Sequence, residues 1–364
     1  MRIAQVAPLY ESVPPKFYGG TERVVSYLTE ELVQQGHEVF LFASGDSITK
    51  ARLVASCPRA LRLDKVIDPF PHHFVHLEQV FERAGSFDLI HFHTDYLHFS
   101  LARRHTTPHL TTLHGRLDLP DLVPIYKKFR ETPVVSISNT QRQPLNWANW
   151  QGTVYHGLPP DLYQYQEAQG KYLAFLGRIA PEKRPDRAIE IAQRAGMKLK
   201  IAAKVDVADR KYMEEVVKPL LDDSKVECIG EINDQGKQEF LANAFALLFP
   251  IDWPEPFGLV LIEAMACGTP VIAYRCGSVP ELVQEGVTGF IVNKMDEAMK
   301  ALERVESFNR KRCRQFFEHR FTAPRMAQDY LRIYHSQIRH QQKIDKPRSV
   351  RSISALIGEA RPSK

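Results

Sequence analysis

Short apolar runs rich in β-branched and aromatic residues alternate with helical patterns along the chain, and this series ends and begins again once. Strands that alternate with helices are typical of parallel sheets built from βαβ units. The predicted strands of the first series are Ile3–Ala7, Glu38–Ala43, Leu89–Phe92, His109–Leu113, Val134–Ile137 and Thr153–His156. Those of the second series are Tyr172–Leu176, Leu199–Ala203, Val226–Ile229, Ala246–Phe249, Val271–Tyr274 and Phe290–Val292. We therefore expect an α/β protein with two doubly wound parallel sheets.

The boundary between the two series lies in Gly157–Gly170, a polar segment rich in Gln and Tyr with two consecutive prolines. This composition is typical of an interdomain linker. Before it, Thr21–Gln35 has apolar residues spaced for one face of a helix, and Gly36 is placed to cap that helix. A last helix is expected over Pro324–Arg339. Because open α/β sheets bind ligands at the carboxyl ends of their strands, two facing sheets predict one central cleft.

The chain has 364 residues, of which 44% are hydrophobic and 25% charged, an ordinary composition for a globular protein of two or three domains. The formal net charge is +5, and much of the excess lies after Arg325. The cysteines form no C-x-x-C pair, which argues against a zinc site or a disulfide framework and favours a reducing cytoplasm; they are Cys57, Cys228, Cys267, Cys276 and Cys313. No apolar run approaches the roughly 20 residues that span a bilayer. We expect a soluble cytoplasmic protein, with contact at the inner face of the membrane as an alternative.

The most informative motif contains two carboxylates, Glu255 and Glu263, eight residues apart between two predicted strands. Pro254 and Pro256 place Glu255 in the loop before a helix, whereas Glu263 lies on an otherwise apolar helix. A carboxylate among apolar neighbours needs a partner, because burying an unpaired charge is costly. Hydroxyls of a sugar or a ribose would supply one, and a nearby Arg or Lys is the simpler alternative.

A binding site for phosphate is predicted around this motif. The backbone amides of Phe257, Gly258 and Leu259 begin the helix, where N–H groups and the helix dipole favour an anion. Arg178 and Lys183 flank a turn at the carboxyl end of the first strand of the second series. Two cations at that edge would bind a diphosphate and stabilise the charge that develops on it as a leaving group.

A third candidate site, Gly19-Gly20, follows the first strand and opens the first helix. Paired glycines let the backbone approach a ligand closely, and the helix start behind them again favours an anion. The pattern is neither G-x-G-x-x-G nor a Walker loop, which weakens the case for a nicotinamide cofactor or for ATP hydrolysis.

These motifs together resemble glycosyltransferase family 4, retaining enzymes with the GT-B fold of two Rossmann-like domains that face a central cleft. The resemblance extends over nearly the whole chain, and its most specific part is the E-x7-E signature with its flanks. The matching segments, in the order of the family, are Gly19–Arg23, Asp88–His93, Thr111–Gly115, Gly177–Lys183 and Glu255–Ile272.

The resemblance implies a role for each matched residue. Arg178 and Lys183 match the residues that bind the donor diphosphate, and Glu263 matches the residue that binds the ribose. Glu255 matches the residue that contacts the hydroxyls of the donor sugar, and His114 matches the histidine beside the reacting centre. These side chains, with the amides of the helix start, form the predicted catalytic and donor-binding set.

The resemblance also implies how the domains are arranged. Residues 1–157 would form the acceptor-side domain, where Gly19 and Gly20 reach the diphosphate, and residues 158–322 the nucleotide-sugar domain. Residues 323–341 would form a helix that crosses back to the first domain, followed by a flexible basic tail over 342–364. The sequence departs from the family in having Arg184 where a Gly often follows the Lys, and His156 where an Asn is usual.

The activity implied is transfer of a hexose or related sugar from a nucleoside diphosphate to an acceptor hydroxyl, with retention at the anomeric carbon. The sequence contains no D-x-D, the metal-carrying motif of the other large transferase fold, so we expect no essential metal or cofactor. UDP is the expected base, on family frequency alone. The acceptor, which is unknown, would contact loops of the first domain, and the aromatic residues Phe70 and Phe74 in Pro69–His76 suggest a platform there.

Two rival functions remain open. His91, His93 and Asp95 form the H-x-H-x-D of a metal-dependent hydrolase, although Tyr96 stands where the dinuclear pattern has a His. A non-catalytic nucleotide-sugar binding protein would have the same fold. Nucleic-acid binding is not expected, because basic and acidic residues are interspersed and no known nucleic-acid motif occurs.

Overall fold

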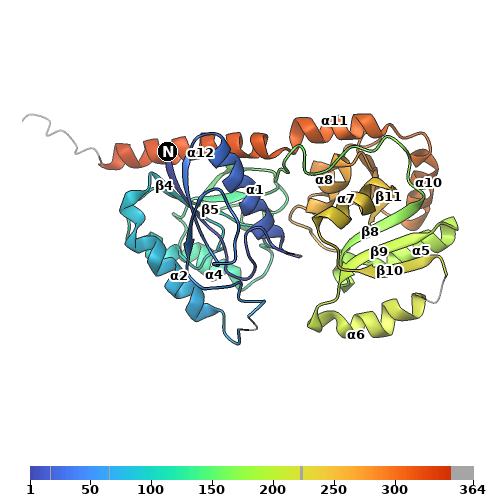
Figure 1. Ribbon diagram of the computed structural model, residues 1–364, viewed down its shortest axis with the longest axis horizontal. Helices are drawn as coiled ribbons and strands as arrows, with labels where there is room; N and C mark the ends of the chain where they lie inside the picture. Colours follow the sequence, from blue (N-terminus) through green and yellow to red (C-terminus); the bar gives the residue numbers. More distant parts are fainter. Residues whose placement is uncertain (17, 65, 222–223, 346–364) are drawn as a thin grey trace, which may run out of the picture.

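The computed structural model describes residues 1–16, 18–64, 66–221 and 224–345, and these form two lobes joined along one side (Figure 1). The first lobe contains a seven-stranded parallel sheet in the order β3-β2-β1-β4-β5-β6-β7. Its strands are β1 (Arg2–Val6), β2 (Glu38–Ala43), β3 (Arg52–Ala55), β4 (Leu89–Phe92), β5 (His109–Thr112), β6 (Val134–Ser136) and β7 (Trp150–Thr153). Helices α1 (Gly20–Gln34), α2 (Phe70–Glu82), α3 (Phe99–Ala102) and α4 (Leu122–Lys128) connect them.

The second lobe contains a six-stranded parallel sheet in the order β10-β9-β8-β11-β12-β13. Its strands are β8 (Tyr172–Arg178), β9 (Leu199–Lys204), β10 (Val226–Gly230), β11 (Ala244–Phe249), β12 (Val271–Tyr274) and β13 (Gly289–Val292). The helices are α5 (Pro185–Ala195), α6 (Arg210–Tyr212), α7 (Asp234–Ala242), α8 (Leu259–Ala266), α9 (Val279–Leu282), α10 (Met295–Val305), α11 (Arg310–Arg320) and α12 (Ala323–Asp345). In each sheet the first three strands follow one another outward in one direction, and the later strands are then added on the other side of the first strand. This strand order confirms the expected doubly wound α/β fold.

Two strands differ from the sequence prediction. The edge strand β3 was not predicted, because it has only four residues and neither end is buried. The last strand of the first sheet is Trp150–Thr153 and not Thr153–His156. Its register places Trp150 opposite Val134 and Thr153 opposite Ser136, so the pairing with β6 ends where the predicted strand was expected to begin.

Helix α1 ends as its sequence predicts. Gly36 has a φ of +84°, a conformation that glycine adopts without strain. Its N–H donates to the carbonyl of Val33 at 2.9 Å, and the N–H of His37 donates to that of Leu32 at 3.1 Å. This pair of hydrogen bonds is the Schellman motif, and it satisfies two carbonyl groups at the end of the helix.

The chain passes between the lobes twice at one place. The N–H of Leu158 donates to the carbonyl of Phe321 at 2.9 Å, and the N–H of Ala323 donates to that of Leu158 at 2.8 Å. A Cβ on Gly157 would lie 2.2 Å from the carbonyl oxygen of Thr322, so this close approach requires glycine. Buried apolar residues continue past this point, and one hydrophobic core joins the two lobes.

Helix α12 runs back along the first lobe beside α1 (Figure 1). Its Tyr334 hydroxyl accepts a hydrogen bond from Gln5 Nε2 at 3.1 Å and lies 2.7 Å from His91 Nδ1, while the Tyr330 hydroxyl lies 2.9 Å from Thr112 Oγ1. Both tyrosines are fully buried. The helix continues to Asp345, beyond the end expected at residue 341; the rest of the predicted tail, 346–364, lies outside the described residues. Among those described, no helix is both long and apolar enough to cross a membrane.

The substitution Tyr334→Phe should destabilise the protein by about 1–3 kcal/mol, because it leaves buried polar groups of Gln5 and His91 without a partner. Urea unfolding followed by fluorescence measures this loss. His335→Ala, an exposed change on the same helix turn, is the control and should alter the free energy of unfolding by less than about 0.5 kcal/mol. Equal stability of Tyr334→Phe and the parent protein would contradict the anchoring role of this hydroxyl.

Candidate active site

A cavity of about 700 Å³ lies between the lobes, where the carboxyl ends of strands from both sheets meet. All ten residues singled out from the sequence line it, although they come from six separate stretches of the chain. They are Gly19, Gly20, His114, Arg178, Lys183, Glu255, Phe257, Gly258, Leu259 and Glu263. The cavity therefore brings together the whole predicted catalytic and donor-binding set, while the role of each residue stays a prediction.

Lys183 and Glu255 are in direct contact in this cavity. The Lys183 ammonium forms an ion pair with the Glu255 carboxylate, and both side chains are mostly buried. Trp253 Nε1 donates to the same carboxylate oxygen at 2.8 Å, and its ring lies 4.8 Å from the Lys183 ammonium. The sequence analysis missed Trp253; its position in the loop just before Glu255 was the available signal.

Arg178, at the end of β8, is surrounded by carboxylates. It forms ion pairs with Glu182, with Asp206 at 3.4 Å and with Asp209 at 3.4 Å. Its side chain is 29% exposed, so the guanidinium is open to the cavity on one side. The Arg178 guanidinium that we expected to bind an anion is therefore already paired with carboxylates, and an entering diphosphate would have to compete with them.

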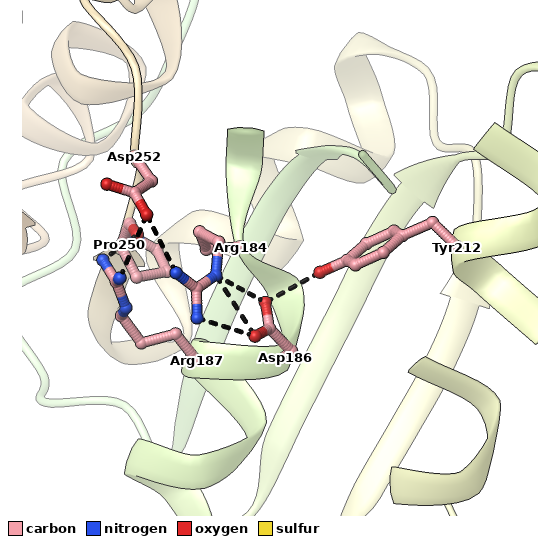
Figure 2. A network of polar contacts seen from close by, with 6 residues as sticks. All are labelled: Arg184, Asp186, Arg187, Tyr212, Pro250 and Asp252. Atoms are coloured by element: carbon pink, nitrogen blue, oxygen red, sulfur yellow. Dashed lines mark hydrogen bonds and ion pairs between the residues drawn. The ribbon is translucent and has the colours of Figure 1, made fainter. Parts of the chain in front are cut away.

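Arg184 fills the position where the family often has Gly, and it adopts the backbone conformation that glycine would supply, with a φ of +55°. Figure 2 shows its guanidinium between Asp186 and Asp252, at 2.9 Å from each. Arg187 donates to the carbonyl of Pro250 at 3.0 Å. These bonds tie the loop after Lys183 to the loop before Glu255, which fixes the spacing of the two groups.

The start of α8 faces the start of α1 across the cavity. The helix begins at Leu259, so Phe257 and Gly258 precede it, and Gly258 has a φ of +84° that favours glycine. A Cβ on Gly20 would lie 3.6 Å from a methyl carbon of Leu259. Free N–H groups at the starts of two helices, one from each lobe, therefore converge on one region of the cavity.

Glu263 has a partner within the protein. Its carboxylate is 3% exposed and lies 2.9 Å from the ammonium of Lys237, with the Tyr163 hydroxyl at 3.4 Å. The simpler of the two expected partners, a nearby cation, is therefore present. Both contacts use the oxygen Oε1, and the residue lines the cavity, so the carboxylate keeps acceptor capacity for a hydroxyl.

A chain of hydrogen bonds fixes the proton on His114. Gln5 Oε1 can only accept, so His93 Nε2, at 2.8 Å, carries a proton and His93 Nδ1 does not. His93 Nδ1 lies 2.9 Å from His114 Nε2, which must then be the donor. His114 Nδ1 is left as an acceptor, with no partner among the described residues. Burial lowers the pKa of His114 to about 3, so the ring is neutral.

The histidines of the metal-hydrolase alternative belong to this same network. His91 lies 2.7 Å from Tyr334 Oη through Nδ1 and 2.7 Å from Thr112 Oγ1 through Nε2, so both of its ring nitrogens are engaged. Both nitrogens of His93 are also engaged. Within the described residues, no three His, Cys, Asp or Glu side chains are grouped to hold a metal ion. Both histidines of the H-x-H pair are therefore engaged in hydrogen bonds within the first lobe.

Polar contacts bridge the two lobes at two places around the cavity. Arg23 on α1 forms an ion pair with Asp234 on α7, and the Tyr18 N–H donates to Glu231 at 3.2 Å. Near the chain crossings, the Glu281 carboxylate accepts from the Thr140 N–H at 2.7 Å and from the Tyr155 hydroxyl at 3.0 Å. At these two places the lobes therefore meet through charged and polar groups, in addition to the hydrophobic core that they share.

Comparison with known families identifies the chain. Residues 18–150 match the family described as Glycosyltransferase Family 4, and residues 164–319 match the one described as Glycosyl transferases group 1. Together with the two sheets and their shared cavity, these matches define a glycosyltransferase with the GT-B fold. The chain belongs to glycosyltransferase family 4, as its motifs indicated.

Similar proteins support this assignment. An uncharacterized glycosyltransferase of Methanocaldococcus jannaschii is 25% identical over 348 residues, covering 80% of this chain and 85% of that protein. A D-inositol 3-phosphate glycosyltransferase of Mycobacterium leprae is 35% identical over 147 residues, covering 37% of this chain and 31% of that protein.

Two solved structures share the fold. AviGT4, a glycosyltransferase involved in avilamycin A biosynthesis, has a TM-score of 0.72 at 24% identity and covers 93% of this chain and 98% of its own. Anabaena HepE in complex with UDP-glucose has a TM-score of 0.70 at 18% identity and covers 92% of this chain and 100% of its own.

Glu22 is the buried carboxyl group on the first-lobe wall of the cavity. It lies in the first turn of α1, is 5% exposed and has no ion pair in the described part of the chain. Burial raises its pKa from 4.5 to about 7. The folded protein therefore retains a proton between these two pH values that the unfolded chain releases, and stability should fall as pH rises through this range.

Glu22→Gln removes this cost of ionisation and should stabilise the protein by about 1–3 kcal/mol at pH 8, with little effect at pH 5. Urea unfolding at the two pH values measures the difference. The control is Glu78→Gln, an exposed carboxylate on α2, for which no pH-dependent gain is expected. A gain for Glu22→Gln that is equal at both pH values would contradict the raised pKa.

Proposed function

We propose that the protein transfers a hexose, or a related sugar, from a nucleoside diphosphate to an acceptor hydroxyl with retention at the anomeric carbon. The observation that carries this proposal is that Arg178 and Lys183 share one cavity with the starts of α1 and α8. Two cations and two sets of free backbone N–H groups form a site suited to a diphosphate. The membership of family 4 supports the reaction class.

The carboxylates of the second lobe suit the rest of the donor. Glu263 would accept hydrogen bonds from the ribose hydroxyls, with Lys237 keeping its charge compensated. Glu255 would accept from the hydroxyls of the donor sugar, and Trp253 and Lys183 hold that carboxylate in place. We propose UDP as the base, because the structurally similar HepE binds UDP-glucose.

The reaction would proceed on one face of the sugar. The bond from the anomeric carbon to the diphosphate oxygen breaks, and the acceptor oxygen forms its bond to the same face. The departing phosphate oxygen takes the proton of the acceptor hydroxyl, so the residues act by orientation and charge. Arg178 and Lys183 stabilise the leaving group. His114 Nδ1, which can only accept, would hold a hydroxyl of the sugar beside the reacting carbon.

The substitutions Lys183→Met and Glu263→Gln should each raise the Kd for UDP-glucose at least about tenfold, equivalent to about 1.4 kcal/mol. They remove a cation beside the diphosphate and an anion beside the ribose. Isothermal titration with UDP-glucose, GDP-glucose and ADP-glucose measures the Kd and identifies the base. Lys211→Met, an exposed change on α6 outside the cavity, is the control. Unchanged affinity in both site variants would contradict this donor site.

Activity should persist in EDTA, and the product should have the same anomeric configuration as the donor, because leaving-group charge is stabilised by side chains and backbone amides. Proton NMR of the first-formed product and of the nucleoside diphosphate released gives both results. An inverted product, or activity restored only by a divalent metal, would overturn the proposed mechanism. Donor binding without any turnover would instead favour the nucleotide-sugar binding protein considered from the sequence.

A further inference from the structure

Asp95 lies on the first-lobe side of the cavity and has an unusual backbone. It follows β4 with a φ of +48°, and it lines the cavity. In the described part of the chain, its carboxylate has neither an ion pair nor a side-chain hydrogen bond. Non-glycine residues in a left-handed backbone conformation are concentrated at functional sites, where the surrounding fold stabilises them. Because Asp95 is exposed, its carboxylate can accept a hydrogen bond from a ligand that enters the cavity.

Aromatic side chains line the cavity on the first-lobe wall, the same wall as Asp95. Tyr10, Phe70 and Tyr96 line the same cavity, and the Phe70 side chain is 51% exposed. The Tyr10 ring packs on His73 at 4.9 Å between centroids. His73 is itself held by the Leu9 N–H, at 3.1 Å, and by a Pro69 carbonyl oxygen at 2.9 Å, so this part of the wall is rigid.

The negative charge of Asp95 reaches the Tyr10 phenol. The pKa of Tyr10 is raised first by burial and then by Asp95; Glu22 acts in the same direction, whereas Arg62 opposes them. Tyr10 and Asp95 line the same cavity, so a ligand bound on the first-lobe side could contact both.

The charges of this wall leave a negative balance. Its three arginines each have a carboxylate partner: Arg62 with Glu11 at 2.7 Å, Arg116 with Asp118 at 2.7 Å, and Arg23 with Asp234. Asp95, on the same wall, has no ion pair within the described ranges, whereas Glu22, whose raised pKa keeps it largely protonated below about pH 7, adds little negative charge. An incoming phosphate or carboxylate group would therefore meet repulsion from Asp95, whereas a hydroxyl group could donate a hydrogen bond to its carboxylate.

We propose that this wall binds an uncharged acceptor whose ring carries adjacent hydroxyl groups, and that Asp95 accepts hydrogen bonds from them. The acceptor ring packs on Tyr10 and Phe70, since aromatic faces contact the C–H surface of such rings, and acceptors that carry phosphate or carboxylate are disfavoured. Asp95 is in this view a residue that positions the acceptor and sets specificity. The inference rests on the proposed glycosyl transfer and adds the chemical class of its acceptor.

The test compares matched acceptors with UDP-glucose as donor, following UDP release. The pairs are glucose with glucose 6-phosphate and myo-inositol with D-myo-inositol 3-phosphate. The parent protein should use an uncharged member with a kcat/KM at least about tenfold above that of its phosphorylated counterpart. Preference for a phosphorylated member, or transfer to no uncharged member, would overturn the proposal.

Variants separate the role of Asp95 from a structural one. Asp95→Asn should raise the acceptor KM about tenfold or more, while the Kd for UDP-glucose and the slow hydrolysis of donor stay unchanged; Asp95→Lys should shift the preference toward the phosphorylated members. Asp121→Asn, an exposed aspartate outside the cavity, is the matched control. An unchanged acceptor KM in Asp95→Asn would contradict this role. Failure of the parent protein to bind any nucleotide sugar would instead contradict the proposed function, and this inference with it.

Discussion

Pairing of opposite charges across separate loops is the constraint on which the cleft depends. Arg178, Lys183 and Lys237 all point into a space partly removed from water, where an isolated charge is costly. Each is paired with a carboxylate from a different element. The loops that carry these groups are consequently held in fixed relation by the same side chains that a substrate would use.

This pairing also explains how a site for a highly charged ligand remains stable without one. A donor diphosphate would take over cations that carboxylates already neutralise, so binding is an exchange of partners. Trp253 keeps Glu255 bonded during such an exchange, because its indole donates to the carboxylate independently of Lys183. Arg184 and Asp252 secure the loops on the opposite side, away from the two exchanging groups.

The sequence was sufficient for the two sheets and the family, because strand periodicity and the E-x7-E motif are local signals. It was insufficient for contacts made between distant elements. Lys237 is 26 positions before Glu263 and on another helix, so only packing brings them together. The proton order along Gln5, His93 and His114 depends in the same way on three neighbouring strands. The short edge strand β3 was missed because its exposed ends carry little hydrophobic pattern.

The paired chain crossings at Leu158 and Thr322 have a mechanical consequence. Two connections of the chain lie side by side there, with Glu281 bonded to Tyr155 close by, so a rotation of one lobe against the other would pivot about that point. Displacement grows with distance from a pivot, so the far rim, where Tyr18 meets Glu231, moves most for a given angle. A small rotation at the shared core would therefore produce a larger movement of the groups that line the cleft, and would bring them toward each other.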